Sequence, residues 1–64
     1  MNNTWKLLLN NTWIYYDQRG IPAAQVVRQG NHHSAWQVGI YGRPSLYVAS
    51  ADVGRGLVKQ TLGI

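Results

Sequence analysis

Residues 36–62 decide the fold, and they read WQVGIYGRPSLYVASADVGRGLVKQTL. Apolar and polar side chains alternate over residues 36–41, which is typical of a half-buried β-strand. A Gly-Arg-Pro turn follows at residues 42–44, and the alternation resumes over residues 45–49. The pattern predicts two antiparallel strands joined by a short turn.

The remainder of this stretch predicts one amphipathic helix over residues 51–62. Ser50 is a favourable N-cap, and Gly63 can end the helix in the left-handed conformation. Apolar side chains gather on one half of the helix, and Gly54 lies in the middle of that half. We therefore expect the helix axis to lie close to the sheet, under Trp36.

An echo near the start of the chain predicts a β-hairpin. The sequence Asn-Asn-Thr-Trp at residues 2–5 returns at residues 10–13. Asn tolerates the positive φ that a tight hairpin turn needs, so an Asn-Asn turn between residues 5–9 and 12–16 explains the echo.

Another strand is expected over residues 21–29, after an Asp-Gln-Arg-Gly turn. Its alternation is blurred, as in a central strand with both faces partly covered. Either Gln25 or Arg28 therefore joins the face that points away from the helix, depending on the register of this strand.

These elements predict an α+β fold, an antiparallel meander of four or five strands with one C-terminal helix on one face. One small domain would span residues 1–64, with a hairpin in 1–17, a three-stranded meander in 21–49 and the helix in 51–62. We expect a core made of Trp36, Val38, Ile40, Leu46, Val48, Val53, Leu57, Val58 and Leu62, which Leu7 and Ile14 can extend.

Composition bounds the class of protein. The chain has 64 residues, no Cys and a net charge of +4. The absence of Cys excludes disulfides and thiolate metal sites, and a chain this short often gains stability from a partner or a second copy. The longest N-terminal apolar run, residues 7–9, is too short for a signal peptide or a membrane span. We expect a soluble, intracellular, cytoplasmic protein that does not contact membranes.

Residues with catalytic potential are few. His32 and His33 are adjacent and would point in opposite directions on an extended chain, so a polar turn explains them best. Asp17 and Asp52 are the only carboxylates, and a turn and a helix start account for them. We expect no catalytic residue, no metal site, no cofactor and no enzyme activity.

The sheet face opposite the helix is the strongest candidate for a binding site. Amides, phenols and a guanidinium would gather there, and such groups contact phosphates, base edges or stacked bases. With cations of the helix added, the candidate residues for nucleic-acid or partner binding are Arg28, Gln37, Tyr41, Arg43, Tyr47, Arg55 and Lys59. Two alternatives would remove this site: the N-terminal hairpin could fold over this face, or a homodimer could bury it.

The order of elements from Ala24 to Leu62, three strands and then a helix, is similar to that of three-stranded-sheet DNA-binding domains. Arm modules of tyrosine integrases and plant ethylene-response-type factors are examples. The similarity implies a helix that backs the sheet and a sheet that enters the major groove. Those sheets carry several Arg and Trp residues on the DNA face, whereas here only Arg28 and Arg43 could serve.

Two functions follow as expectations. The first is a non-enzymatic nucleic-acid-binding accessory protein, with a dimer needed for useful specificity. The second is a protein-binding module or inhibitor that caps an acidic protein surface, because Tyr and Trp gain contact area at low entropic cost. In size the chain is similar to small phage-encoded proteins such as anti-CRISPR proteins, but its basic charge argues against mimicry of DNA.

Overall fold

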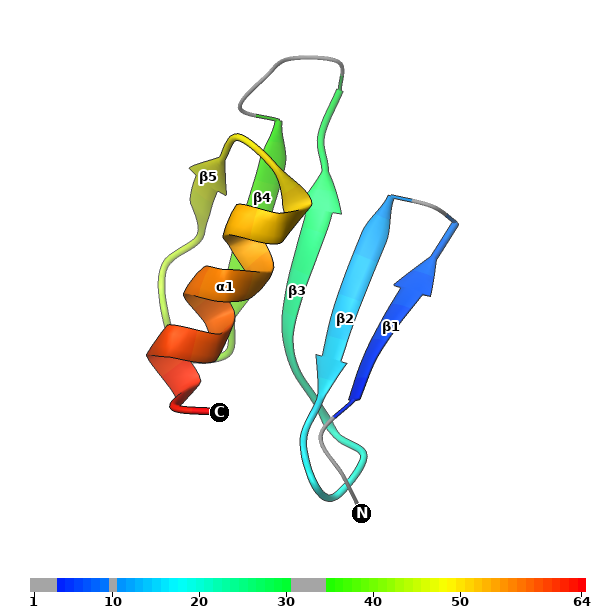
Figure 1. Cartoon of the computed structure of the whole chain (residues 1–64), viewed down its shortest axis with the longest axis vertical. Helices are drawn as coiled ribbons and strands as arrows, with labels where there is room; N and C mark the ends of the chain where they lie inside the picture. The colour runs from blue at the N-terminus through cyan, green and yellow to red at the C-terminus, as the bar shows by residue number, and fades with distance from the viewer. Residues whose placement is uncertain (1–3, 10, 31–34) are drawn as a thin grey trace.

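The computed structural model describes residues 4–9, 11–30 and 35–64. They form one sheet with the strand order β1-β2-β3-β4-β5, in which each strand pairs antiparallel with the next, and one helix packs against it (Figure 1). The elements are β1 (Thr4–Leu8), β2 (Thr12–Tyr16), β3 (Pro22–Arg28), β4 (Trp36–Ile40), β5 (Leu46–Val48) and α1 (Ala51–Leu62). The predicted α+β meander with a C-terminal helix is confirmed.

Local chemistry fixes the turn between β2 and β3. The Asp17 carboxylate oxygen Oδ1 accepts hydrogen bonds from the backbone N–H groups of Arg19 at 2.8 Å and Ile21 at 3.0 Å. Gly20 takes φ +79°, a conformation that side chains rarely adopt. The Asp17 N–H also donates to the Ile21 carbonyl at 3.0 Å, so side-chain and backbone bonds together close the turn between β2 and β3.

The β1–β2 connection differs from the predicted Asn-Asn turn. β1 ends at Leu8, one residue early, and Leu9 has φ +53°, the only positive φ of a non-glycine residue in the described ranges. The N–H of Asn11 donates to the Leu8 carbonyl at 3.3 Å. Asn10 lies outside the described residues, so its predicted role is not addressed.

Helix α1 has the predicted caps. Ser50 Oγ accepts a hydrogen bond from the Val53 N–H at 3.2 Å. At the other end, Gly63 has φ +71° and its N–H donates to the Lys59 carbonyl at 2.9 Å. Both ends of the helix thus satisfy groups that have no partner within it.

The centre of the core lies where α1 crosses β3 and β4. Val26, Val38 and Val58 are the largest fully buried side chains. A Cβ on Gly54 would lie 2.8 Å from Val26 Cγ1 and 3.1 Å from Val38 Cγ2, so the absence of a side chain lets the helix approach the sheet. The close approach was predicted, but its neighbours are these two valines rather than Trp36.

Several predicted core residues are exposed instead. Val53 is 54% exposed, and Leu7, Leu46 and Leu62 also keep much of their surface in contact with solvent. α1 contacts β3, β4 and β5 and leaves Leu7 on β1 uncovered, and Val53 and Leu62 lie near the two ends of the helix. The buried positions that the sequence did not single out are Tyr15, Ala24, Val26 and Ala35.

The N-terminal hairpin continues the sheet and does not fold over its other face. β1 and β2 lie beside β3 in the same layer, whereas α1 contacts β3, β4 and β5 (Figure 1). On the helix side, the hairpin is tied to the helix by Arg55, whose guanidinium lies 4.1 Å from the centre of the Trp13 ring. Trp5 packs against Tyr15 with ring centres 5.3 Å apart.

The helix of the described chain is too short to span a lipid bilayer.

Candidate nucleic-acid interface

Strand register assigns each side chain to one face of the sheet. Lys6, Ile14, Gln25 and Gly39 are cross-strand partners in one row, and Val27, Gln37 and Tyr47 form part of the next. The first row alternates with Tyr15 and Ala24, which face the helix, so it points the other way. We call this side the open face and define it by Lys6, Leu8, Thr12, Ile14, Tyr16, Gln25, Val27, Gln37, Gly39 and Tyr47, with Tyr41 just beyond β4.

A hollow lies in the open face where one side chain is missing. Its volume is about 270 Å³, and it is lined by Ile14, Pro22, Ala23, Ala24, Gln25, Gly39 and Tyr41. We call it the Gly39 hollow. A Cβ on Gly39 would meet Gln25 Cγ at 3.5 Å and Gln25 Nε2 at 3.7 Å, which is ordinary contact. The glycine therefore leaves space beside the Gln25 amide without being required by the backbone, since its φ is not positive.

Aromatic rings are presented to solvent on this side. Tyr41 is 86% exposed and Tyr47 is 61% exposed. Tyr16 is half-buried, with the Lys6 ammonium 5.8 Å from its ring centre. Gln37 is held by a hydrogen bond of 3.0 Å that its Oε1 accepts from Gln29 Nε2, so its own NH₂ group can donate to a ligand.

The charges divide unevenly between the two sides. Both carboxylates of the chain belong to the helix side: Asp52 pairs with Arg55 in the first turn of α1, and Asp17 lies near Leu62 and Ile64. The open face carries Lys6 and no carboxylate. A polyanion approaching this side therefore meets a cation and no fixed negative charge.

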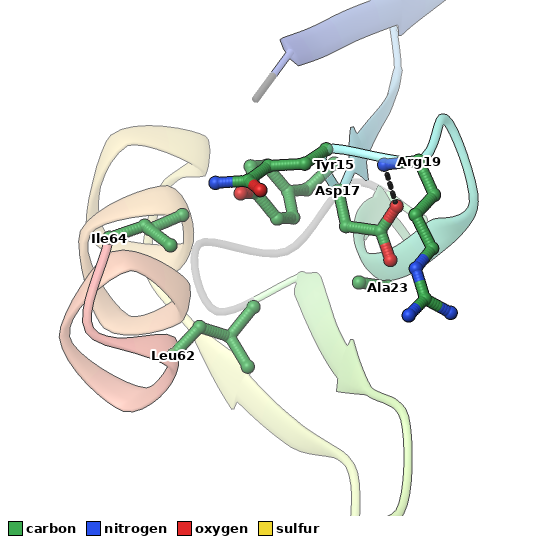
Figure 2. A pocket seen from close by; sticks show the side chains of 7 residues that line it. Tyr15, Asp17, Arg19, Ala23, Leu62 and Ile64 are labelled. Carbon is green, nitrogen blue, oxygen red and sulfur yellow. Dashed lines mark hydrogen bonds between the residues drawn. The ribbon is translucent and has the colours of Figure 1, made fainter. Parts of the chain in front are cut away.

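A second recess lies on the helix side, between the C-terminal end of α1 and the β2–β3 turn. It has a volume of about 350 Å³ and is lined by Tyr15, Asp17, Gln18, Arg19, Ala23, Leu62 and Ile64 (Figure 2). Burial, and to a lesser degree the negative charge of Asp17, raise the pKa of the Tyr15 phenol. The phenol thus stays neutral, and one oxygen of Asp17 already accepts two backbone hydrogen bonds.

The structure separates the seven candidate residues. Gln37 and Tyr47 lie on the open face and Tyr41 lies at its end. Arg43 is exposed in the β4–β5 turn, where it lines a shallow pocket with Leu57 and Thr61 of the helix. Arg43 therefore reaches toward the helix side as well as the rim of the sheet.

The other three cations lie on the helix side. Arg28 shares a face with Trp36, 5.9 Å from the ring centre, and its Nε donates to the Gly30 carbonyl at 3.0 Å. Register thus places Gln25, not Arg28, on the open face. Arg55 and Lys59 belong to α1 and cannot contact a ligand of the open face.

Lys6, Ile14 and Tyr16 belong to the open face but were not among the candidates, and the prediction that Ile14 extends the core is wrong because its register places it in the row of Lys6 and Gln25. Their signal is the same two-residue alternation that identified the later strands, and it places Lys6 and Ile14 opposite Trp5 and Tyr15. This alternation assigns the three residues to the open face only once the hairpin is known to continue the sheet.

Within residues 4–9, 11–30 and 35–64, no three His, Cys, Asp or Glu residues cluster as metal ligands would. The predicted roles of His32 and His33 in a polar turn lie outside the described residues.

Comparison of the chain with protein-family models, curated proteins and solved structures gives no match. What the protein binds has to be inferred from its own surface.

Proposed function

We propose that this protein is a non-enzymatic nucleic-acid-binding accessory protein and that the open face is its binding surface. One observation carries the proposal: Tyr41 and Tyr47 are exposed on the side that holds Lys6, while both carboxylates belong to the other side. Exposed rings stack on bases and cations pair with phosphates, which are the two contacts that every nucleic acid offers.

Magnitudes indicate which contact dominates. Lys6 and Arg43 supply about two phosphate contacts, and each contact changes the slope of log affinity against log salt by only about 0.7 to 0.9. Stacking contributes about 1–3 kcal/mol for each base. Binding to the rings of Tyr41 and Tyr47 therefore outweighs the electrostatic part, and we expect weak affinity with a shallow salt dependence.

The test is a fluorescence-anisotropy titration of labelled oligonucleotides at about 20 and about 150 mM salt. Lys6→Glu is expected to weaken binding several-fold at low salt and less at high salt. Lys59→Glu on the helix is the matched control, because it changes the net charge equally on the other side of the molecule. Equal losses for the two variants, or no binding of the parent to any oligonucleotide at low salt, would contradict the proposal.

A protein-binding function is favoured by a different surface, the edge of the sheet at β1. Leu7 and Leu8 are exposed there, and Leu9 is 90% exposed beyond the strand. An apolar edge strand can pair with an extended segment of another chain. In a capture experiment, a protein partner at this edge should stay bound after nuclease treatment. Leu7→Lys should abolish its capture, and Tyr47→Ala should leave the capture unchanged. If nuclease treatment removes the captured protein together with the nucleic acid, this function is rejected.

A further inference from the structure

We infer that the open face takes single-stranded nucleic acid in preference to duplex and that the Gly39 hollow seats one unstacked base. This inference rests on the proposed function and specifies its ligand. It follows from the shape of the sheet and from the chemistry around the Gly39 hollow.

The width of the sheet disfavours duplex DNA. Five strands at a spacing of about 4.8 Å span about 19 Å, whereas the major groove of B-DNA is about 12 Å wide. A three-stranded sheet of about 10 Å would fit this groove, but here β1 and β2 continue the layer beyond β3 (Figure 1). A single strand has no groove to enter, and its bases can lie flat on the open face.

The Gly39 hollow has the size and lining that one base needs. Its volume of about 270 Å³ is just below the range of enclosed small-molecule pockets, about 300–1,000 Å³, as expected of an open depression that takes one flat ring. Ile14 and Tyr41 give it apolar and aromatic walls, and the Gln25 amide supplies a donor and an acceptor for a base edge. A base stacked within a duplex cannot lie flat in this open depression without leaving its helix.

Phosphates next to the seated base would meet a cation. Lys6 lies in the same cross-strand row as Gly39, three strands away, and its Cα is therefore about 14 Å from that of Gly39. The Lys6 ammonium lies 5.8 Å from the centre of the Tyr16 ring on β2, so Lys6 is placed for a neighbouring nucleotide and not for the seated one. Arg43 does not line the hollow: it lies in the β4–β5 turn, beside Leu57 and Thr61 of the helix, so Lys6 is the cation of the open face itself.

Filling the hollow is the direct test. Gly39→Val adds an isopropyl group, three carbon atoms, to the cavity, and β-branched residues suit a strand. Gly39→Ala adds only a Cβ in ordinary contact with the flexible Gln25 side chain. Gly56→Ala is the control outside the site, since a Cβ there meets nothing within 4 Å. Circular dichroism and thermal unfolding check that each variant is folded.

The ligands are a labelled oligodeoxythymidine of about 12 nucleotides, an oligomer of the same length without bases, and a duplex of equal length. We expect the parent to prefer the single strand to the duplex and to the base-free oligomer. Gly39→Val should weaken single-strand binding by roughly 5- to 150-fold, the value of one lost base contact, and Gly39→Ala should weaken it less.

Tyr41→Ala gives an independent measurement, because this highly exposed side chain can be removed without affecting the core. It should also weaken single-strand binding, whereas Tyr41→Phe should retain it. If the duplex or the base-free oligomer binds as tightly as the single strand, or if Gly39→Val binds like the parent, the inference is wrong while the proposed function stands. If no nucleic acid binds the parent at low salt, both fall, and protein binding at the β1 edge becomes the better candidate function.

Discussion

Two glycines of α1 show how one residue type can have opposite roles within a single turn. Gly54 faces Val26 and Val38, where an added Cβ would approach within 2.8 Å, whereas Gly56 faces open space. The first is required by packing, and the second only lowers helix propensity. The sequence pattern separated the two, because Gly54 falls among apolar side chains and Gly56 among polar ones.

We therefore expect Gly56→Ala to raise the free energy of unfolding by about 1 kcal/mol. In a domain of this size that corresponds to a rise of about 4–8 °C in Tm. Gly54→Ala should lower stability, because two fully buried valines have to move. Urea unfolding of both variants tests the contrast, and equal effects would mean that the helix does not approach the sheet as described.

Tyr15 gives the molecule a dependence on alkaline pH. Burial and the Asp17 charge raise its pKa in the folded state above the value of 10.0 in a model peptide. The folded state thus holds the phenol proton more tightly, and the resulting stability is complete below pH 10.0 and is lost as pH rises through the folded pKa. Tyr15→Phe should remove this part of the decline in unfolding free energy above pH 10.0, measured by chemical unfolding at a series of pH values.

At the scale of elements, the hairpin and the helix are joined by few side chains. Arg55 lies over Trp13, and its Nε is buried without a hydrogen-bond partner among the described residues. Burying an N–H group without a hydrogen bond is unfavourable, and stacking of the guanidinium on Trp13 offsets part of that free-energy cost. α1 has fewer contacts with β1 and β2 than with β3 to β5, so this contact and the packing of Tyr15 in the core with Val58 attach the hairpin to the helix.

Arg55→Ala should therefore loosen the hairpin selectively. We expect faster amide hydrogen exchange in β1 and β2 with little change at Val26 and Val38, and a loss of about 1 kcal/mol in global stability. Asp52→Ala is the matched control, because it removes the ion pair but leaves the stack. Similar exchange in all five strands of the Arg55 variant would show that the sheet opens as one unit.

The later elements could be predicted because their signals are local. Alternation over residues 36–49, the Ser50 cap and the Gly63 stop each depend on neighbouring residues. Local signals could not predict all the residues of the open face. The choice between Gln25 and Arg28 depends on pairing with β2, where the register shifts between Tyr15 and Tyr16, and the place of the hairpin depends on contacts such as Arg55 with Trp13.

At the scale of the whole molecule, a small core makes ligand binding visible in stability. Among the residues that the structure describes, the largest fully buried side chains are three valines, Val26, Val38 and Val58, and a domain of this length is marginally stable. A ligand that binds only the folded state adds about 2.7 kcal/mol at a concentration of 100 times its Kd.

We expect single-stranded oligonucleotide to raise the Tm of the parent in a concentration-dependent manner. Gly39→Val should show a much smaller rise at the same concentration, because its hollow is filled. Differential scanning fluorimetry or calorimetry measures both, and a rise of the same size with a base-free oligomer would assign the effect to charge alone.

The unbroken order of the meander also determines how the chain reaches its native state. Each strand from β1 to β4 pairs with the strand that follows it in the sequence. The hairpins can therefore form one after another along the chain. Each pairing closes only a short loop and therefore loses little chain entropy. Such sheets fold faster than sheets whose neighbouring strands are remote in sequence. The helix follows β5 in the sequence, so it packs on a layer whose strands precede it.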